Sequence, residues 1–386
     1  MRLEEILQPI PPAQFFREHW QRRPLLVRGM RGRFSGLFSS KDVGRLIHFL
    51  APLPPEGIKL IKGGDHYGLD WTDTQGRPRL SAVREAWRAG YTVVVNAMDT
   101  RWEPLALLAA SLHEELHHPV DINLYYSPPQ VVSSSAHFDV MDSFILQVEG
   151  SKVWEVREPA GALPLADEQA GIPQDALPPL VLETELREGD VLYLPRGHVH
   201  VTKTTEAASL HLTVGINVVT WVDLFAAAVS AARDDERLRA ALPPSFLDAP
   251  AEMRATFQEL RAELTGRLDM EAALGRLAER LLVGAVPPPG DERPAQEVEL
   301  RAETPLARRA GVVCHTLAGA GYAAIQYTGG KIVGPEKLAA AFRYVAQHRT
   351  LTAADLPGQL STQEQLVLAR RLVRGGLLEV RGPGES

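Results

Sequence analysis

The sequence predicts an α+β chain with a mainly β core, and three features support that prediction. Residues 120–219 contain runs in which β-branched and aromatic residues alternate with others between Gly and Pro breaks, which is typical of strands. Residues 221–285 are rich in Ala, Leu, Arg and Glu at helical spacing. Residues 297–386 contain two helical segments and then a short strand. We therefore expect a β domain with N-terminal helices over 1–220, a helical region over 221–290 and a C-terminal domain over 297–386.

Length and composition limit the class of protein. The 386 residues suffice for two or three domains, and no apolar run approaches the length that crosses a bilayer. The N-terminus lacks the basic-then-apolar pattern of a signal peptide. The single cysteine, Cys314, excludes an internal disulfide and fits a reducing compartment, so we expect a cytoplasmic protein. Cys314 lies in an apolar run that we interpret as helical, where it would be a small buried hydrophobe.

The charge is distributed unevenly along the chain. Residues 301–386 hold 11 Lys and Arg against 6 Asp and Glu, although the whole chain has a net charge of −7. A basic segment on an acidic body is compatible with attraction to RNA or to RNA-bound protein, but a solvated helix face explains it more simply. The C-terminal domain shows no dense basic recognition helix with interleaved aromatic residues. Direct nucleic-acid binding is therefore not expected.

The remaining regular elements follow from local patterns. We predict helices near 41–50, 103–117, 336–348 and 361–374, strands near 57–61 and 91–96, and an N-terminal helix that stops before Pro24 and leads into a strand. Ser361 and Glu364 form a capping-box pattern at the start of the last helix. His113 and His117 are four residues apart and could bind a metal. No third ligand follows them, and a cationic helix C-terminus is the simpler explanation.

His137 and Asp139 form the first part of a candidate metal site. On a strand, residues two apart point to the same face, so both side chains would project together. A third ligand from a distant strand would complete a set of two imidazoles and one carboxylate, which holds Fe(II) on one face and leaves the opposite positions open. The candidates are His198 and His200, which follow a strand and a Pro-Arg-Gly turn. If that segment is extended, both imidazoles share a face, and spacing does not choose between them.

Three further residues are candidates for the lining of the same pocket. Lys152 follows a strand and a Glu-Gly turn, and a cation there could anchor the far carboxylate of a dicarboxylate cosubstrate. His211 and Thr213 alternate with Leu212 and Val214, so this pair could face the pocket. A hydrogen-bonded core histidine is an equally good interpretation of His211. The loops at 128–135 and 157–182 could border the site.

These segments together resemble the JmjC-type ribosomal oxygenases of the cupin superfamily, which are Fe(II)- and 2-oxoglutarate-dependent protein hydroxylases. The matching pieces are His137-Phe-Asp139, Phe144 to Trp154, Gly189 to His200 and Ser209 to Thr213. The resemblance implies a double-stranded β-helix (the JmjC/cupin barrel), a helical dimerisation region and a C-terminal winged-helix-like domain. The chain departs from the family pattern at His198, where relatives carry an apolar or aromatic residue.

The resemblance also implies roles for individual residues. It assigns His137, Asp139 and His200 to the metal, because the pattern Pro-Arg-Gly-x-x-His favours His200 over His198. It assigns Lys152 to the C5 carboxylate of 2-oxoglutarate. It places Asn123 and Tyr125 beside that cosubstrate.

The activity implied by the resemblance is hydroxylation of an arginine or histidine side chain of a ribosomal protein, with Fe(II) as cofactor and 2-oxoglutarate and O2 as cosubstrates. The relatives also imply a homodimer. One alternative is the same chemistry on a peptide natural product or a free amino acid. Another is a non-catalytic metal-binding cupin/winged-helix regulator. Lys152 argues against the regulator, because a pure binding module needs no cosubstrate anchor.

Overall fold

The chain divides into two compact units, Met1–Val218 and Val219–Ser386. The computed structural model describes residues 1–49, 57–68, 71–168, 171–231, 235–248, 250–290, 300–319 and 321–381. The boundary between the units lies two residues before the predicted end of the β domain, whereas the predicted division of the second part into two domains stays a prediction. Within the described ranges, none of the helices has the length and apolar character needed to span a membrane.

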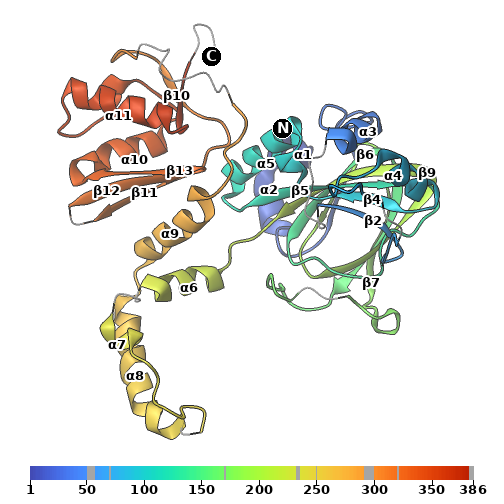
Figure 1. Ribbon diagram of the computed structural model, residues 1–386, viewed down its shortest axis with the longest axis horizontal. Helices are drawn as coiled ribbons and strands as arrows, with labels where there is room; N and C mark the ends of the chain where they lie inside the picture. The colour runs from blue at the N-terminus through green and yellow to red at the C-terminus, as the bar shows by residue number, and fades with distance from the viewer. Residues whose placement is uncertain are drawn as a thin grey trace. The chain divides into compact units, whose positions relative to one another are not determined.

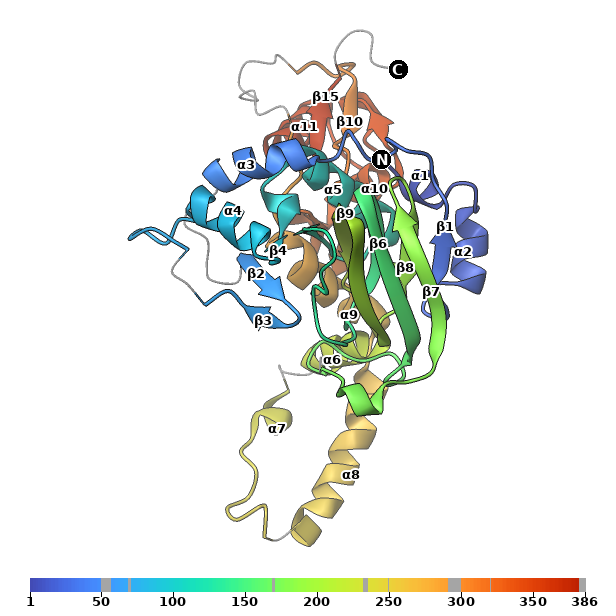
Figure 2. The ribbon, with the colours of Figure 1, turned by 90° about the vertical axis from the view of Figure 1, so that its right-hand side faces the viewer.

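The first unit is built on one large antiparallel sheet. Its strands are β1 (Leu25–Val27), β2 (Ile58–Lys62), β3 (Asp65–His66), β4 (Thr92–Val95), β5 (Val120–Ser127), β6 (Asp142–Pro159), β7 (Leu180–Arg187), β8 (Val191–Leu194) and β9 (His198–Ile216). The order is β1-β8-β6-β9-β5-β4-β2-β3, and β7 pairs with β6 outside this path. Figure 2 shows β9, β6 and β8 side by side, as their registers require.

The long strands β6 and β9 each contribute to both walls of a barrel. The first part of β6 pairs with β8 and with the end of β9, as at Ser143 and Gly215. The later part of β6 pairs with β7 and with the start of β9. The register shifts near Gly150, whose φ is +67° and where a Cβ would lie 1.7 Å from the carbonyl oxygen of Ala208. Only glycine fits such a bend, and the sheet closes into the predicted double-stranded β-helix.

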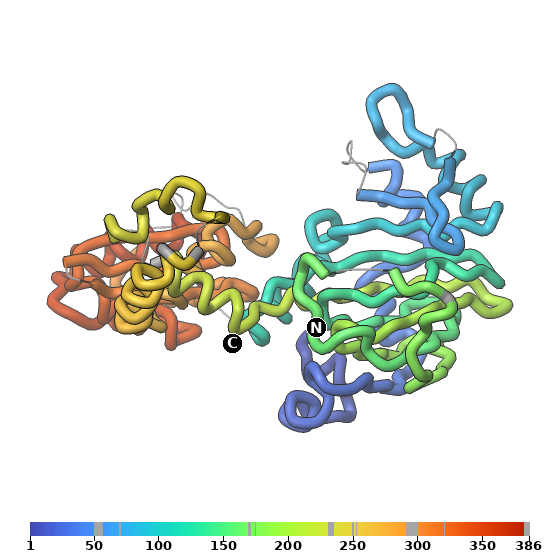
Figure 3. The backbone as a smooth tube through the Cα atoms, turned by 90° about the horizontal axis from the view of Figure 1, so that it is seen from below, coloured from blue at the N-terminus to red at the C-terminus, as the bar shows by residue number. Residues whose placement is uncertain are grey.

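The two faces of the barrel strands carry different residues. Ile122 and Leu124 of β5 belong to the main hydrophobic core, whereas Tyr125 lines a cavity inside the barrel. Helices also contribute side chains to this core, and they are α1 (Leu3–Leu7), α2 (Pro12–Glu18), α3 (Ser40–Phe49), α4 (Leu80–Arg88) and α5 (Glu103–Leu116). In Figure 3 the blue and cyan N-terminal segments flank the green barrel strands. Short 3-10 turns lie at η1 (Met98–Thr100) and η2 (Gln174–Ala176).

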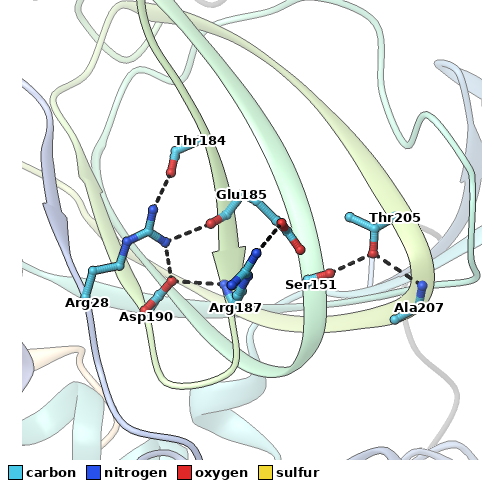
Figure 4. Close-up of polar contacts among 8 residues, drawn as sticks. All are labelled: Arg28, Ser151, Thr184, Glu185, Arg187, Asp190, Thr205 and Ala207. Carbon is cyan, nitrogen blue, oxygen red and sulfur yellow. Dashed lines mark hydrogen bonds and ion pairs between the residues drawn. The ribbon is translucent and has the colours of Figure 1, made fainter.

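A polar clasp around Asp190 fixes the edge of the barrel, where β7 turns into β8 (Figure 4). The buried carboxylate of Asp190 accepts hydrogen bonds from Arg28 Nη1 at 2.6 Å and from the backbone N–H groups of Gly29 and Arg187, both at 3.0 Å. Arg28 also donates to Thr184 Oγ1 and to the backbone carbonyl of Glu185. The clasp therefore ties the segment after β1 to both strands.

Replacing Asp190 by alanine is expected to destabilise the first unit by roughly 2–3 kcal/mol, because it removes a buried charged acceptor and leaves part-buried N–H donors without a partner. Chemical denaturation of the variant beside the parent protein measures this loss. Arg187→Ala is the matched control, because its side chain makes an exposed ion pair with Glu185 and should contribute less than about 1 kcal/mol. Equal losses in the two variants would contradict a structural role for the clasp.

The second unit begins with helices and continues as a mixed α/β module. The helical part contains α6 (Trp221–Ala231), α7 (Glu236–Arg239), α8 (Pro250–Arg267), α9 (Met270–Ala278) and the π-helical turn η4 (Glu279–Val283). The module contains β10 (Leu306–Arg308), β11 (Cys314–Gly319), β12 (Tyr322–Tyr327), β13 (Gly330–Pro335), η5 (Glu336–Leu338), α10 (Ala339–Gln347), β14 (Thr350–Leu351), η6 (Ala353–Asp355), α11 (Thr362–Arg374) and β15 (Leu378–Val380). Its two sheets have the orders β14-β10-β15 and β11-β12-β13, and Figure 1 labels most of these elements.

The C-terminal module confirms two predictions and corrects one. Both predicted helices and the final strand are present, and Ser361 and Glu364 form the predicted capping box at α11. The helical interpretation of the run around Cys314 is wrong. Cys314 is half-buried at the start of β11 and pairs with Tyr327. Short apolar runs do not reveal their period, so helix and strand are hard to distinguish there.

Candidate metal centre

The structure brings His137, Asp139 and His200 together. Each offers one ligand atom, and these atoms lie within 4.8 Å of one another. Over the described ranges, this is the one group of three or more His, Cys, Asp or Glu residues arranged in that way. The two segments are joined by backbone hydrogen bonds, including one of 2.8 Å from His200 N–H to the carbonyl of His137. His137 and Asp139 lie in the loop before β6 and not on the predicted strand, with His137 in isolated bridges.

Both imidazoles are oriented by backbone carbonyls. His137 Nδ1 lies 2.9 Å from the carbonyl oxygen of Ser135, and His200 Nδ1 lies 3.1 Å from that of His198. An Nδ1–H that donates to these carbonyls leaves Nε2 free to bind a metal. His200 Nε2 lies 3.8 Å from Asp139 Oδ2, and burial lowers the pKa of His200 to about 4. The imidazole of His200 is therefore neutral at pH 7, the form that binds metals.

His198 does not belong to this group. It is the first residue of β9 and follows Gly197, whose φ of +87° marks a sharp turn. Its Nδ1 lies 3.1 Å from the carbonyl oxygen of Pro195, and burial lowers its pKa. In a regular strand, the imidazoles of His198 and His200 would lie on one face. His198 nevertheless does not join the ligand atoms of His137, Asp139 and His200.

A cavity of about 110 Å³ lies inside the barrel, and of the three ligands His137 and Asp139 line it whereas His200 does not. Its walls combine polar and aromatic side chains from the loops and barrel strands. They are Ile61, Tyr125, Ser133, Ser134, His137, Asp139, Ile145, Lys152, Trp154, Thr202 and Thr213. The sequence therefore predicted Tyr125, Lys152 and Thr213 at a pocket that they do line.

Lys152 is a buried cation in this cavity, with 1% of its surface exposed. Its Nζ donates to Ser127 Oγ at 3.2 Å, and no carboxylate of the described chain pairs with it. Burial lowers the pKa of Lys152 to about 7. An ammonium group out of water without a counterion is costly. An anion that entered the cavity would remove that cost.

Three hydroxyl groups form a cluster that reaches Lys152 through Ser127, and one of them, Ser133, comes from the loop at 128–135 that was expected to border the site. Thr92 Oγ1 donates to Ser127 Oγ at 2.9 Å and lies 3.1 Å from Ser133 Oγ, and all three residues are buried. Ser127 was accessible to prediction, because it lies two residues beyond Tyr125 and so shares its face of β5. Ser133 lies in the polar loop that the sequence placed at the site, whereas Thr92 lies in another segment and nothing in its local sequence marks it.

His211 lies within the barrel but does not line the cavity. Its ring stacks on Tyr125 with centroids 4.8 Å apart, and it meets Trp154 edge-on at 5.6 Å. Burial, together with Lys152 and His200, holds the pKa of His211 well below its usual value. Its Nδ1 is buried without a hydrogen-bond partner in the described residues. His211 is therefore a neutral part of an aromatic wall.

Asn123 also lies outside the cavity lining. Its Oδ1 accepts from the Ala97 N–H at 3.0 Å, and its Nδ2 donates to Asp121 Oδ2 at 3.2 Å. The amide is therefore occupied in holding neighbouring groups. Asp121 itself has a raised pKa, mainly because of burial and then because Asp99 and Asp139 are near.

The fold and the three ligands define the class of protein: a double-stranded β-helix with a metal-binding group at the barrel interior. Comparison with known proteins makes this more specific. Residues 98–224 match the family model described as the JmjC domain. This range contains all three candidate ligands and Lys152.

Curated proteins with similar sequences include ribosomal oxygenases and a histidyl-hydroxylase. Ribosomal oxygenase 1 of Rattus norvegicus is 30% identical over 265 residues, covering 64% of this chain and 42% of the relative. The bifunctional lysine-specific demethylase and histidyl-hydroxylase NO66 of Branchiostoma floridae is 26% identical over 310 residues, covering 74% of this chain and 47% of the relative. The matched part of the chain thus spans less than half the length of these relatives.

Solved structures show the same fold. The crystal structure of the Escherichia coli ribosomal oxygenase YcfD is 20% identical, with a TM-score of 0.58 and coverage of 96% of this chain and 98% of that chain. A structure of YcfD in complex with cobalt and 2-oxoglutarate matches with the same TM-score. Residues 98–224 therefore resemble a JmjC domain, and the named proteins to which the chain is similar include ribosomal oxygenases.

Proposed function

We propose that this protein is an Fe(II)- and 2-oxoglutarate-dependent oxygenase that hydroxylates a side chain of a ribosomal protein. The observation that carries the proposal is that two features meet at one cavity, which His137, Asp139 and Lys152 all line. One is a set of two histidines and a carboxylate, and the other is a buried lysine with no counterion in the described chain. The first suits Fe(II) with open positions, and the second suits the far carboxylate of a dicarboxylate.

Different residues of the chain would bind the metal and the cosubstrate. His137, Asp139 and His200 would hold the metal on one face, with the carbonyls of Ser135 and His198 fixing the imidazoles. Iron with 2-oxoglutarate and O2 supplies the oxidation. Lys152, oriented by Ser127, would pair with the C5 carboxylate of 2-oxoglutarate.

The walls of the cavity would contribute positioning and exclusion of water. Tyr125, Ile145 and Trp154 present aromatic and apolar surface, which strengthens electrostatic contacts by keeping the cavity dry. Thr213 is a hydroxyl on the same lining and would contact the cosubstrate. Asn123 and His211 would act indirectly, through Asp121 and through the Tyr125 ring.

The charge near the metal ligands supports a basic side chain as the group that is hydroxylated. Asp121 hydrogen-bonds to Asn217 Nδ2 at 2.6 Å and lies near Asp99 and Asp139. With Asp139 assigned to the metal, the other two carboxylates favour a cationic or protonatable group, such as arginine or histidine, over an acidic one. Relatives named ribosomal oxygenase and histidyl-hydroxylase are consistent with a protein substrate of this kind.

The proposal is tested by succinate formation from 2-oxoglutarate with Fe(II) and ascorbate under air, with and without a ribosomal fraction. Mass spectrometry of that fraction should show one added oxygen atom on a mapped side chain. Asp139→Ala, which removes a proposed ligand, is the inactive control. Turnover without a modified protein would redirect the search to peptides or free amino acids. Iron binding without any turnover would favour a non-catalytic regulator.

Binding of 2-oxoglutarate is expected to weaken above pH 7. Burial lowers the pKa of Lys152 to about 7, so below that pH the ammonium is present before the ligand arrives. Above it, binding must take up a proton, and the dissociation constant should rise by up to about tenfold per pH unit. Anaerobic calorimetry in buffers of different ionisation enthalpy measures both effects. Lys152→Arg, charged throughout, is the matched control, and a flat profile in the parent protein would contradict the mechanism.

We further propose that the helical region mediates a homodimer. Helix α6 exposes large apolar side chains, with Trp221 74% exposed and Phe225 59% exposed. Residues four apart lie on the same helix face, so these two form one apolar patch. Light scattering should show a dimer for the parent protein and a monomer for Trp221→Asp/Phe225→Asp. A monomeric parent protein would contradict this proposal.

A further inference from the structure

The first unit contains a second and larger cavity, outside the barrel and away from the metal ligands. Its volume is about 320 Å³, and it is lined by α3, α4 and the paired strands β4 and β5. Figures 1 and 2 show α3 and α4 next to each other beside β4. None of the residues that line it belongs to the lining of the barrel cavity.

One part of this cavity is apolar and aromatic. Val43, Ile47 and Val83 are buried side chains of the two helices that face it. Trp87 and Tyr126 stack on each other in its wall, with ring centroids 5.0 Å apart and planes at 16°. Such a wall favours the flat or branched body of an organic molecule, because apolar and aromatic surface is removed from water on contact.

The other part of the cavity is cationic. Lys41, Arg84 and Arg88 all line it, and all are exposed. None of the three has an ion pair or side-chain hydrogen bond with any residue in the described ranges. The carboxylate of Glu149 lies beside the cavity, where it accepts from the Ser40 N–H at 2.9 Å at the start of α3, but it makes no ion pair with these three cations. Three cations converge on one cavity without neutralising partners.

We propose that this cavity binds a small amphipathic organic anion. Its apolar or aromatic body would lie against the Trp87 and Tyr126 rings, and its anionic group would contact Arg84, Arg88 and Lys41. Arginine suits such a role, because its planar guanidinium binds carboxylate, sulfonate and phosphate oxygens in pairs. The inference stands on this cavity alone and does not depend on the oxygenase proposal.

Gly44 provides a way to close the cavity. It lies in α3 at the cavity lining, and a Cβ built there meets only Arg84 Nη2, at 3.8 Å. A leucine at this position would therefore extend into the cavity without displacing backbone. Its helix propensity exceeds that of glycine, so α3 should not be weakened.

The test uses 8-anilinonaphthalene-1-sulfonate, a fluorescent anion with an aromatic body, and N-phenyl-1-naphthylamine, its uncharged counterpart. Arg84→Gln/Arg88→Gln should weaken sulfonate binding about tenfold or more and leave the uncharged probe within about twofold. Gly44→Leu should abolish binding of both probes at this cavity. Arg45→Gln is the matched control, because Arg45 is an exposed cation of the same helix that does not line the cavity.

Exposed apolar patches elsewhere on the protein also bind such probes, but these variants leave those patches unchanged. A difference in probe binding between a variant and the parent protein therefore reports on this cavity. Sulfonate affinity that is the same in the parent protein and in Arg84→Gln/Arg88→Gln would overturn the proposal. So would equal binding of both probes to Gly44→Leu with the parent's thermal unfolding temperature retained. Loss of sulfonate binding in Arg45→Gln to the same extent would show a general charge effect and would also overturn it.

Discussion

His200→Ala is expected to abolish succinate formation, whereas His198→Ala is expected to leave it within about threefold of the parent protein. His200 Nε2 lies 3.8 Å from Asp139 Oδ2 and belongs to the three-ligand group, and His198 does not. Removing residues that merely orient a ligand already costs about 10–100-fold in metal affinity. Removing the ligand itself should therefore weaken Fe(II) binding by more than about 100-fold.

The two variants form a matched pair, because both remove a buried imidazole from the start of the same strand. Anaerobic Fe(II) titration and the succinate assay give the two readouts, and circular dichroism checks the fold. The backbone bond between His200 N–H and the carbonyl of His137 survives in His200→Ala, so the fold should persist. Loss of turnover with His198→Ala alone would assign the third ligand to the wrong histidine.

The sequence was sufficient to place residues at the cavity where their position depends on a single segment of the chain. Lys152 lies within β6 and not after a strand, but the spacing on which the resemblance rests did identify it, and it lines the cavity beside His137 and Asp139. The alternation of β9 correctly placed Thr213 facing inward and Leu212 in the core. Strand alternation depends only on local geometry, so it can be recognised from a single segment.

The sequence was insufficient for features that depend on how far a side chain reaches toward the cavity or on contacts between distant segments. Alternation put His211 on the inner face, but the ring packs against Tyr125 and Trp154, which line the cavity, and does not line it itself. The hydroxyls of Thr92 and Ser133 meet Ser127 only because two strands and a loop converge. Likewise, His198 and His200 lie two residues apart at the start of β9, but the pairing with β6 is irregular there and the ring of His198 lies against the carbonyl of Pro195.

Lys152→Met is expected to abolish tight binding of 2-oxoglutarate and, at the same time, to stabilise the protein. The side chain is buried, its pKa is lowered to about 7, and it has no counterion in the described chain. Loss of the anchor should raise the 2-oxoglutarate concentration needed for half-maximal turnover by about 100-fold, since a charge-assisted buried contact contributes roughly 2–3 kcal/mol. Methionine fills nearly the same volume without a charge, and Ser127 keeps Thr92 as a partner.

The expected difference in stability between Lys152→Met and the parent protein depends on pH. Because the folded pKa lies below the unfolded value, the unfolded chain binds the extra proton between about pH 7 and pH 10, and the parent protein becomes more stable as pH rises through that range. Lys152→Met lacks this slope and should exceed the parent by roughly 3 kcal/mol at pH 7, with the difference shrinking toward pH 10. Urea denaturation of both proteins without metal or 2-oxoglutarate measures it. A less stable variant at pH 7 would mean that the ammonium is well solvated or paired in the folded protein. A more stable variant that binds 2-oxoglutarate poorly would show that the cavity keeps an unfavourable charge in place for its ligand.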